Sequence, residues 1–161
     1  MIIILPFLFI TAFVILITRV KVTPQDTAIV IERLGTYHRV EVNSVYFLIP
    51  FIEKVVSSIT LREQDFNLSR TAKTADNISK TVNAEVYYQV VNPELFTYNV
   101  KEPLKILKRM VKEQLTENIS MYEKDALADK DVAISERMIA ALNVDTAQWG
   151  VKITRIYITI Y

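Results

Sequence analysis

The chain has 161 residues with a formal net charge of +1, no cysteine, one histidine and two glycines. The length fits one modest domain plus an anchoring segment, and the balanced charge argues against a broad nucleic-acid-binding surface. The absence of cysteine excludes disulfides and thiolate metal sites. Two glycines are too few for a glycine-rich phosphate loop, and one histidine leaves no pair for zinc. We therefore expect no cofactor, no metal and no nucleic-acid partner.

The N-terminal segment is uniformly apolar. Residues 1–18 carry no charged side chain, and a helix of that length spans roughly 27 Å, close to the hydrocarbon thickness of a bilayer. We expect residues 1–20 to form a transmembrane anchor whose lipid contacts include Ile2, Ile3, Leu5, Phe7, Phe9, Phe13, Ile15 and Leu16. A cleaved signal peptide is disfavoured by the lack of a basic n-region and of an Ala-x-Ala-like site. A buried core helix is disfavoured because no polar face is present.

The charges that flank this segment predict its orientation. Arg19 and Lys21 follow the apolar run, whereas only the terminal amine precedes it. Positive charge gathers on the cytoplasmic side of membrane spans. The chain is therefore expected to be a single-pass membrane protein with residues 21–161 in the cytoplasm.

Beyond Pro24, β-branched residues and turn signals predict strands at 27–33, 45–49 and 54–64, with a turn at Leu34-Gly35. The polar stretch 67–77 is expected to be a loop. Residues 78–91 alternate apolar and polar side chains, which predicts a strand with one buried face. Asn92-Pro93 ends this strand.

After Pro103 the apolar period changes to three and four residues, which predicts an amphipathic helix over 103–119 with a basic polar face. A second helix is expected over 131–144, and a shorter one is possible within 122–128. Residues 151–161 read as a final strand. Its apolar residues change parity along the strand, so we expect a β-bulge near Arg155.

The chain resembles a known family in several stretches that occur in a characteristic order. They are Val22-Thr-Pro-Gln-Asp26, Ile31-Glu-Arg-Leu-Gly-Thr-Tyr-His-Arg39, Phe47-Leu-Ile-Pro-Phe51, Asp76-Asn77 with the strand ending at Asn92-Pro93, and Trp149-Gly-Val-Lys-Ile-Thr-Arg155. They resemble the SPFH or band 7 family, which includes stomatins, prohibitins, flotillins and the HflK/HflC modulators of a membrane protease. The single N-terminal span followed directly by the domain looks most like the bacterial QmcA-type slipins.

The resemblance implies an α/β (α+β) fold for residues 21–161, an SPFH domain with a mostly antiparallel sheet and packed helices. It also implies homo-oligomers on a membrane. Asn43-Ser44 stands where the family usually has Pro-Gly, Ala75 stands where a Lys is common, and the coiled coil that usually follows the domain is absent after Ile158.

The function that this resemblance implies is an oligomeric, membrane-anchored scaffold that organises membrane microdomains and membrane-protein partners. The alternative is a regulatory subunit that restrains a membrane AAA protease. We expect no enzymatic activity, because no set of residues recommends a serine hydrolase or another catalytic site.

Two groups of residues are candidates for contacts. Phe47, Pro50 and Phe51 belong to an apolar run, broken by Pro50, that either dips into the headgroup region or is a buried strand end. Lys105, Arg109 and Lys112 on the predicted helix either meet anionic lipid or an acidic neighbouring subunit, or form a solvated face interleaved with Glu113 and Glu117. His38 is expected to be a surface residue. Unpaired edges of the strands at 78–91 or 151–161 are further candidates for subunit contacts.

Overall fold

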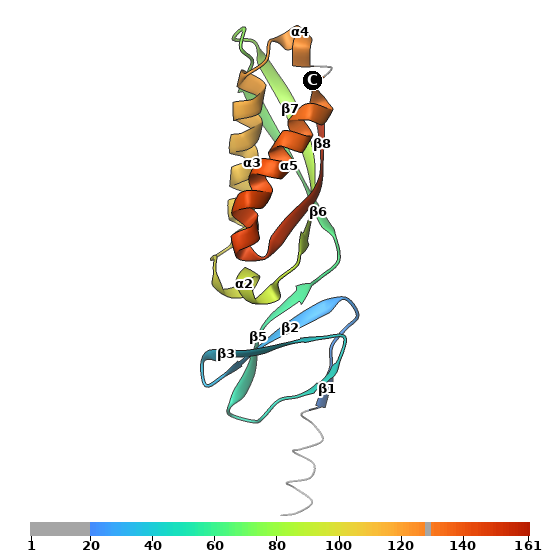
Figure 1. Ribbon diagram of the computed structural model, residues 1–161, viewed down its shortest axis with the longest axis vertical. Coiled ribbons are helices and arrows are strands. Elements are labelled where there is room, and N and C mark those ends of the chain that lie inside the picture. The colour runs from blue at the N-terminus through green and yellow to red at the C-terminus, as the bar shows by residue number, and fades with distance from the viewer. Residues whose placement is uncertain (1–19, 128–129) are drawn as a thin grey trace, which may run out of the picture. The chain divides into compact units, whose positions relative to one another are not determined.

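The computed structural model describes residues 20–127 and 130–161 (Figure 1). Within these ranges no helix combines the length and apolarity needed to span a bilayer. The predicted anchor and its lipid-facing residues at positions 2–16 lie outside the described residues. The chain divides into two compact units, unit 1 up to Thr60 and unit 2 from Leu61 to Tyr161.

Unit 1 consists of short antiparallel strands. In its described part, β1 (Val20–Val22) pairs with β4 (Val45–Phe47), and β2 (Thr27–Arg33) lies between β3 (Thr36–Val42) and β5 (Glu53–Thr60). Both edges of β2 are paired, and its residues from Ala28 to Glu32 are all buried, so side chains on both faces of this strand are covered. A small core forms where Ile29 and Ile31 pack with Tyr46 and Leu48.

The turn between β3 and β4 departs from the usual Pro-Gly pattern but keeps a left-handed residue. Asn43 has φ +48°, a conformation that Asn tolerates better than most residues. Its side-chain oxygen accepts a hydrogen bond of 2.9 Å from the backbone N–H of Asp26. The Asn side chain therefore ties this turn to the β1–β2 connection.

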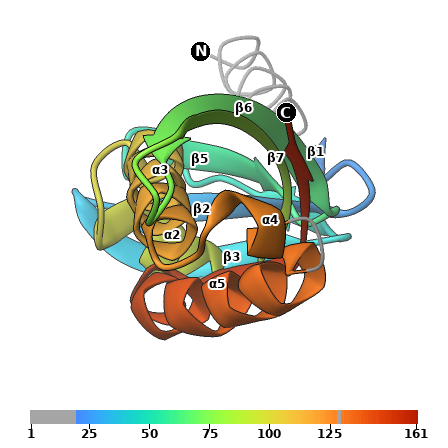
Figure 2. The same cartoon turned by 90° about the horizontal axis from the view of Figure 1, so that it is seen from above.

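Unit 2 is a two-layer α/β structure. Its sheet has the order β6 (Gln64–Lys73), β7 (Ser79–Val90) and β8 (Val151–Ile160), with both pairs antiparallel. The helices that follow β7 are α2 (Pro93–Tyr98), α3 (Pro103–Ser120), α4 (Lys124–Leu127) and α5 (Asp131–Thr146), and a 3₁₀ turn (Ala147–Trp149) leads into β8. Figure 2 shows α3 and α5 on one side of this sheet, α3 against β6 and α5 against β8.

The core of unit 2 lies between the sheet and these two helices. The predicted apolar face of β7 is confirmed, because Val82, Ala84, Val86, Tyr88 and Val90 are all at most 3% exposed. The helices bury the residues that their period predicts, which are Leu107, Val111, Leu115 and Ile119 on α3 and Ile134, Met138 and Leu142 on α5. The predicted mixed α/β class with antiparallel sheets and packed helices is confirmed.

Some sequence-based predictions were wrong. Most of the expected loop at 67–77 belongs to β6, which buries Phe66, Leu68 and Ala72 while Arg70 interrupts its apolar face. Strands β1 and β3 and helix α2 were not predicted. The strand at 78–91 is central rather than an edge, because β6 and β8 pair with its two sides. The bulge near Arg155 is confirmed: the register passes from Tyr87↔Arg155 to Tyr88↔Ile153.

Candidate functional site: an apolar turn held by a buried carboxylate

The turn between β4 and β5 in unit 1 presents its most apolar side chain to solvent. The carbonyl of Ile49 accepts hydrogen bonds from the N–H groups of Ile52 and Glu53, at 3.3 and 2.9 Å, which closes the turn. Phe51 at its tip has φ +64° and is fully exposed, at 102% of its reference area. A left-handed conformation costs an ordinary residue roughly 1–2 kcal/mol. The turn therefore has a strained backbone and exposes a large apolar side chain to water.

The Glu53 side chain holds the base of this turn. Its carboxylate has no solvent exposure and accepts hydrogen bonds from Arg33 at 2.7 Å and Arg39 at 2.8 Å. It also accepts the N–H of Ile49 at 3.1 Å, so the same group joins β2, β3 and the start of the turn. His38 Nε2 lies 3.5 Å from it, and the His38 side chain is 31% exposed.

The electrostatics of Glu53 follow from these contacts. Burial of the carboxyl opposes ionisation, but the hydrogen bonds from Arg39, Arg33 and Ile49 outweigh burial and lower the pKa of Glu53 to about 2. Arg39 extends the network, because it also donates to Glu41 and to the carbonyl of Phe47, each at 2.8 Å. The ion network therefore fixes both the first and the last residue of the turn.

A second turn joins the same apolar end of unit 1. Leu34, between β2 and β3, has φ +52° and is 78% exposed. Its N–H donates to the carbonyl of Ile52 at 2.9 Å, which places the two turns side by side. Leu34, Phe51 and Ile52 are here called the apolar tip. Gly35, beside Leu34, has φ +85° and allows the tight return into β3.

The start of β1 lies beside the end of β4, the strand that leads into the turn of the apolar tip. Val20 pairs with Phe47 and Val22 with Val45, so the start of β1 and the end of β4 lie at the same end of the ribbon. Phe47 continues within four residues into Phe51.

The three residues that the sequence predicts as lipid contacts in the run 47–51 differ in exposure. Phe51 is fully exposed, Phe47 is 36% exposed and Pro50 is intermediate. The neighbouring Tyr46 and Leu48 are core residues. Tyr46 and Leu48 on either side of Phe47 are thus buried, whereas none of the three predicted residues is buried. Sequence reasoning did not identify Glu53, Leu34 or Ile52 as residues of this site.

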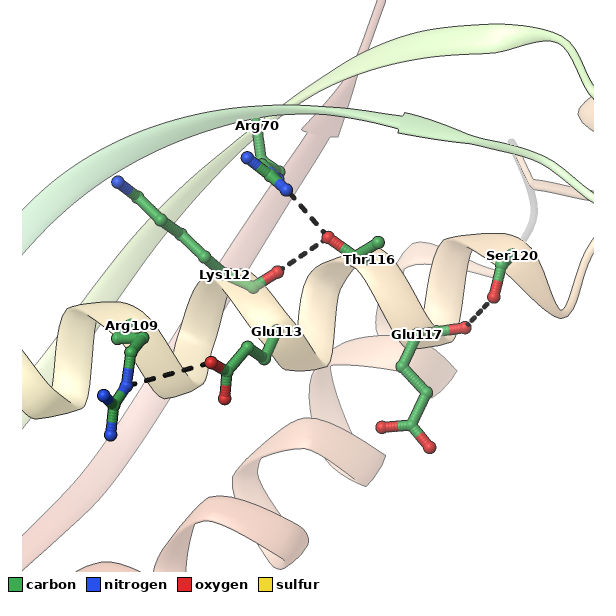
Figure 3. A pocket seen from close by; sticks show the side chains of 7 residues that line it. All are labelled: Arg70, Arg109, Lys112, Glu113, Thr116, Glu117 and Ser120. Atoms are coloured by element: carbon green, nitrogen blue, oxygen red, sulfur yellow. Dashed lines mark hydrogen bonds and ion pairs between the residues drawn. The ribbon is translucent and has the colours of Figure 1, made fainter.

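The predicted basic residues lie on the solvent side of α3 in unit 2. Lys105 pairs with Glu102 at 3.0 Å and Arg109 with Glu113 at 3.8 Å, which matches the interpretation as a solvated face for these two. Arg109 and Lys112 line a groove of about 500 Å³. Figure 3 shows this groove, in which Arg70 of β6 donates to Thr116 of α3 at 3.4 Å. Within residues 20–127 and 130–161, Lys112 has no ion pair.

Within the described residues, no group of three or more His, Asp or Glu side chains is arranged to hold a metal ion.

Comparison with known proteins identifies the family. The family model described as SPFH domain / Band 7 family matches residues 21–160. The chain belongs to the SPFH/band 7 family. The match begins next to the predicted anchor and includes both the apolar tip of unit 1 and the whole sheet of unit 2.

Individual relatives agree with this assignment. An uncharacterized protein of Mycobacterium tuberculosis is 28% identical over 151 residues, which cover 92% of this chain and 39% of the relative. A stomatin-like protein of Caenorhabditis elegans is 25% identical, with 86% of this chain and 43% of the relative covered. The human stomatin-like protein 2, mitochondrial, is 23% identical, with 86% and 39% covered. The chain thus spans about two fifths of the length of these relatives.

Proposed function

We propose that this SPFH protein is a membrane-anchored scaffold whose copies assemble on a bilayer and organise lipids and membrane proteins. The observation that carries the proposal is the apolar tip, where Phe51 is fully exposed on a turn whose first residues are bonded by a buried carboxylate. In water, a strained turn that exposes an aromatic ring has no evident benefit. At a lipid surface it has one, because the backbone of the turn is already ordered and less conformational entropy is lost on binding.

The free energy that burial of the apolar tip can supply indicates what the contact can do. Complete burial of Phe51 and Leu34 contributes about 1.5–3 kcal/mol each. That is too little for stable membrane attachment, which usually takes more than one weak signal. In the proposed arrangement residues 1–20 supply the attachment as a single span. The apolar tip then sets the orientation of unit 1 against the headgroups, with the partly exposed Arg33 close by.

The topology that goes with this proposal is cytoplasmic for residues 21–161. It is supported by the positive charges Arg19 and Lys21, which follow the apolar segment. The role needs no catalytic residue and no cofactor. The lipid bilayer and further copies of the chain are the partners that it requires.

The test uses residues 20–161 with vesicles of phosphatidylcholine and phosphatidylserine, where the apolar tip must act without the anchor. Phe51→Asp should reduce vesicle binding by about tenfold or more, because burial of a Phe side chain is worth roughly 1.5–3 kcal/mol. Val144→Asp is the matched control, since Val144 is 72% exposed on α5 of unit 2 and its change should leave binding unaltered. Equal binding of the Phe51 variant and the parent chain in a flotation assay would refute the contact.

A further inference from the structure

The sheet of unit 2 has edges on β6 and β8 to which no described strand adds. The first half of the β8 edge is covered, because the Asn143 side chain of α5 bonds the N–H and the C=O of Ile153, at 2.8 and 3.0 Å. Beyond the bulge, Tyr161 donates its N–H to the carbonyl of Thr81. Backbone groups of successive residues point alternately toward and away from the paired strand. Since those of Tyr161 point toward β7, those of Ile156 and Ile158 point away from β7, at the open edge. Within the described chain nothing bonds to them.

A groove of about 410 Å³ follows this open part of β8. It lies between residues 155–159 and the first turns of α5. Val132, which is 65% exposed, and the half-buried Ile139 line it, together with the acidic side chains of Asp131 and Glu136. Within residues 20–127 and 130–161 neither carboxylate has an ion pair. The β8 edge therefore offers backbone hydrogen bonds, apolar surface and negative charge together.

The opposite edge of unit 2 has the complementary charge. Arg70 on the β6 edge and Lys112 on α3 line the groove of Figure 3, and in the described chain neither has a carboxylate partner. The β8 groove also contains Arg155, which is paired with Glu63, and the β6 groove also contains Glu117 and the Arg109–Glu113 pair. The lining of the β8 groove is therefore net acidic, and that of the β6 groove is net basic. Such a pair of surfaces suits head-to-tail contact between copies.

We propose that β6 of one copy adds beside β8 of the next in a parallel pairing, which joins the unit 2 sheets of neighbouring copies. The inference rests on the proposed oligomer and names its contact. Because β6 and β8 both run antiparallel to β7, they are parallel to each other. Neighbouring copies related by a rotation about an axis along the strands therefore present β6 to β8 in a parallel orientation.

The register of the sheet supports this pairing. Leu68, Ala84 and Ile158 lie in one row across the strands, so Leu68 of the second copy meets Ile158 of the first. Both side chains face the helix layer, as a parallel ladder requires. The outward backbone groups of Ile158 then fall between residues 67 and 69 of the neighbour.

The charges agree with the same register. Asp65 and Arg155 occupy one row on either side of Tyr87. In the proposed pairing Asp65 of one copy therefore lies beside Arg155 of the next on the solvent face. On the helix face, Arg70 and Lys112 of one copy approach the groove that carries Asp131 and Glu136 of the other.

Cysteine cross-linking tests the register, since the chain has no native cysteine. Ser69 and Thr159 lie in one row on either side of Asn83. Within a chain they are about 9.6 Å apart, two strand spacings, which is too far for a disulfide. In the proposed pairing they are neighbours at about 4.8 Å. The full chain with Ser69→Cys and Thr159→Cys, oxidised in mild detergent, should form a ladder of covalent multimers.

The matched control is Thr71→Cys with Tyr157→Cys, which shifts the pair out of register by four residues, about 13 Å along the strand. It should give no multimers, and neither should Ser69→Cys alone. Absence of the ladder from a chain that remains oligomeric would overturn the β6–β8 contact and leave the scaffold proposal standing. A monomeric chain would overturn both.

Charge reversal tests the two surfaces independently. A chain with Arg70→Glu and Lys112→Glu has two acidic edges, and a chain with Asp131→Lys and Glu136→Lys has two basic edges. Each alone should associate at least tenfold more weakly than the parent chain in sedimentation, while an equimolar mixture should regain association by alternating the two. Unchanged association of either chain alone, or failure of the mixture to recover while both remain folded by circular dichroism, would contradict the proposal.

Discussion

Glu53 is the residue on which the local structure of unit 1 depends most. Its carboxylate neutralises Arg33 and Arg39 and also bonds the backbone of the turn that carries Phe51. Without Glu53, Arg33 and the N–H of Ile49 would lose this acceptor, and Arg39 would keep, within the described chain, only Glu41 as an ion-pair partner. The apolar tip therefore depends on a charged side chain that is itself fully buried.

We predict that Glu53→Gln destabilises unit 1 by about 3 kcal/mol, in the range found when one partner of a buried ion pair is removed. Glu41→Gln is the control from the same network. The Glu41 side chain is 26% exposed and pairs with Arg39 but not with Arg33. Loss of its charge should therefore cost at most about 1 kcal/mol. Urea unfolding followed by circular dichroism measures both. Equal effects of the two changes would show that burial of Glu53 does not matter.

The pH dependence of stability follows from the same carboxylate. The pKa of Glu53 is lowered from 4.5 to about 2 in the folded chain. Its contribution is therefore complete above about pH 5 and is lost as the pH falls through the folded pKa near 2. The difference in unfolding free energy between the parent chain and Glu53→Gln should be constant from pH 8 to about pH 5 and should shrink below that. A difference that persists at pH 2 would contradict the assignment.

At the scale of elements, the entry into β8 depends on a close backbone approach. Gly150 has φ +68°, and a Cβ there would lie 2.3 Å from the carbonyl oxygen of Asn92. The Gly150 carbonyl also accepts the N–H groups of Val91 and Asn92, at 2.8 and 3.1 Å. The end of β7 and the start of β8 are therefore joined at this glycine.

Gly150→Ala should destabilise unit 2 by about 3 kcal/mol or more, since it adds a steric clash to the cost of a positive φ. Gly35→Ala separates the two effects. Gly35 also has a positive φ, but its added Cβ would meet open space, so the change should cost only about 1 kcal/mol in unit 1. Hydrogen exchange resolves the two units. A Gly150 variant no less protected than the Gly35 variant would refute the role of the contact with Asn92.

The sequence predicted the elements whose pattern is local. Helices α3 and α5 and strand β7 follow from the spacing of their apolar residues. Strand β6 was missed because Arg70 stands at a position on its core-facing side, at a sheet edge where a long side chain reaches the neighbouring helix and solvent. Helix α2 could have been predicted from Asn92 and Pro93. The Asn92 side chain accepts hydrogen bonds from the N–H groups of Glu94 and Leu95, and Pro93 begins the helix.

The candidate site was predicted only in part. The Pro-Phe sequence pointed to Phe51, because an apolar run that ends at a proline is typical of a projecting turn. Glu53 could not be found in this way, since its partners Arg39 and Arg33 lie 14 and 20 residues away and meet it only after β2, β3 and β5 have paired. Leu34 was recognised as a turn residue, but its contact with Ile52 is likewise a tertiary feature.

At the scale of the whole molecule, each unit has a separate role in the proposed scaffold. Unit 1 carries the apolar tip, and unit 2 carries a net acidic groove beside β8 and a net basic groove beside β6. The family match covers both units, since it extends over residues 21–160. Contact with lipid and contact between copies are thus predicted to be separable by mutation.

The most direct test of the scaffold proposal is the mass of the full 161-residue chain after extraction from membranes in a mild detergent, measured by native mass spectrometry. We predict that the chain is recovered from the membrane fraction and that its mass corresponds to a discrete multiple of the 18.6 kDa protomer. A chain recovered from the soluble fraction as a protomer would contradict the proposal.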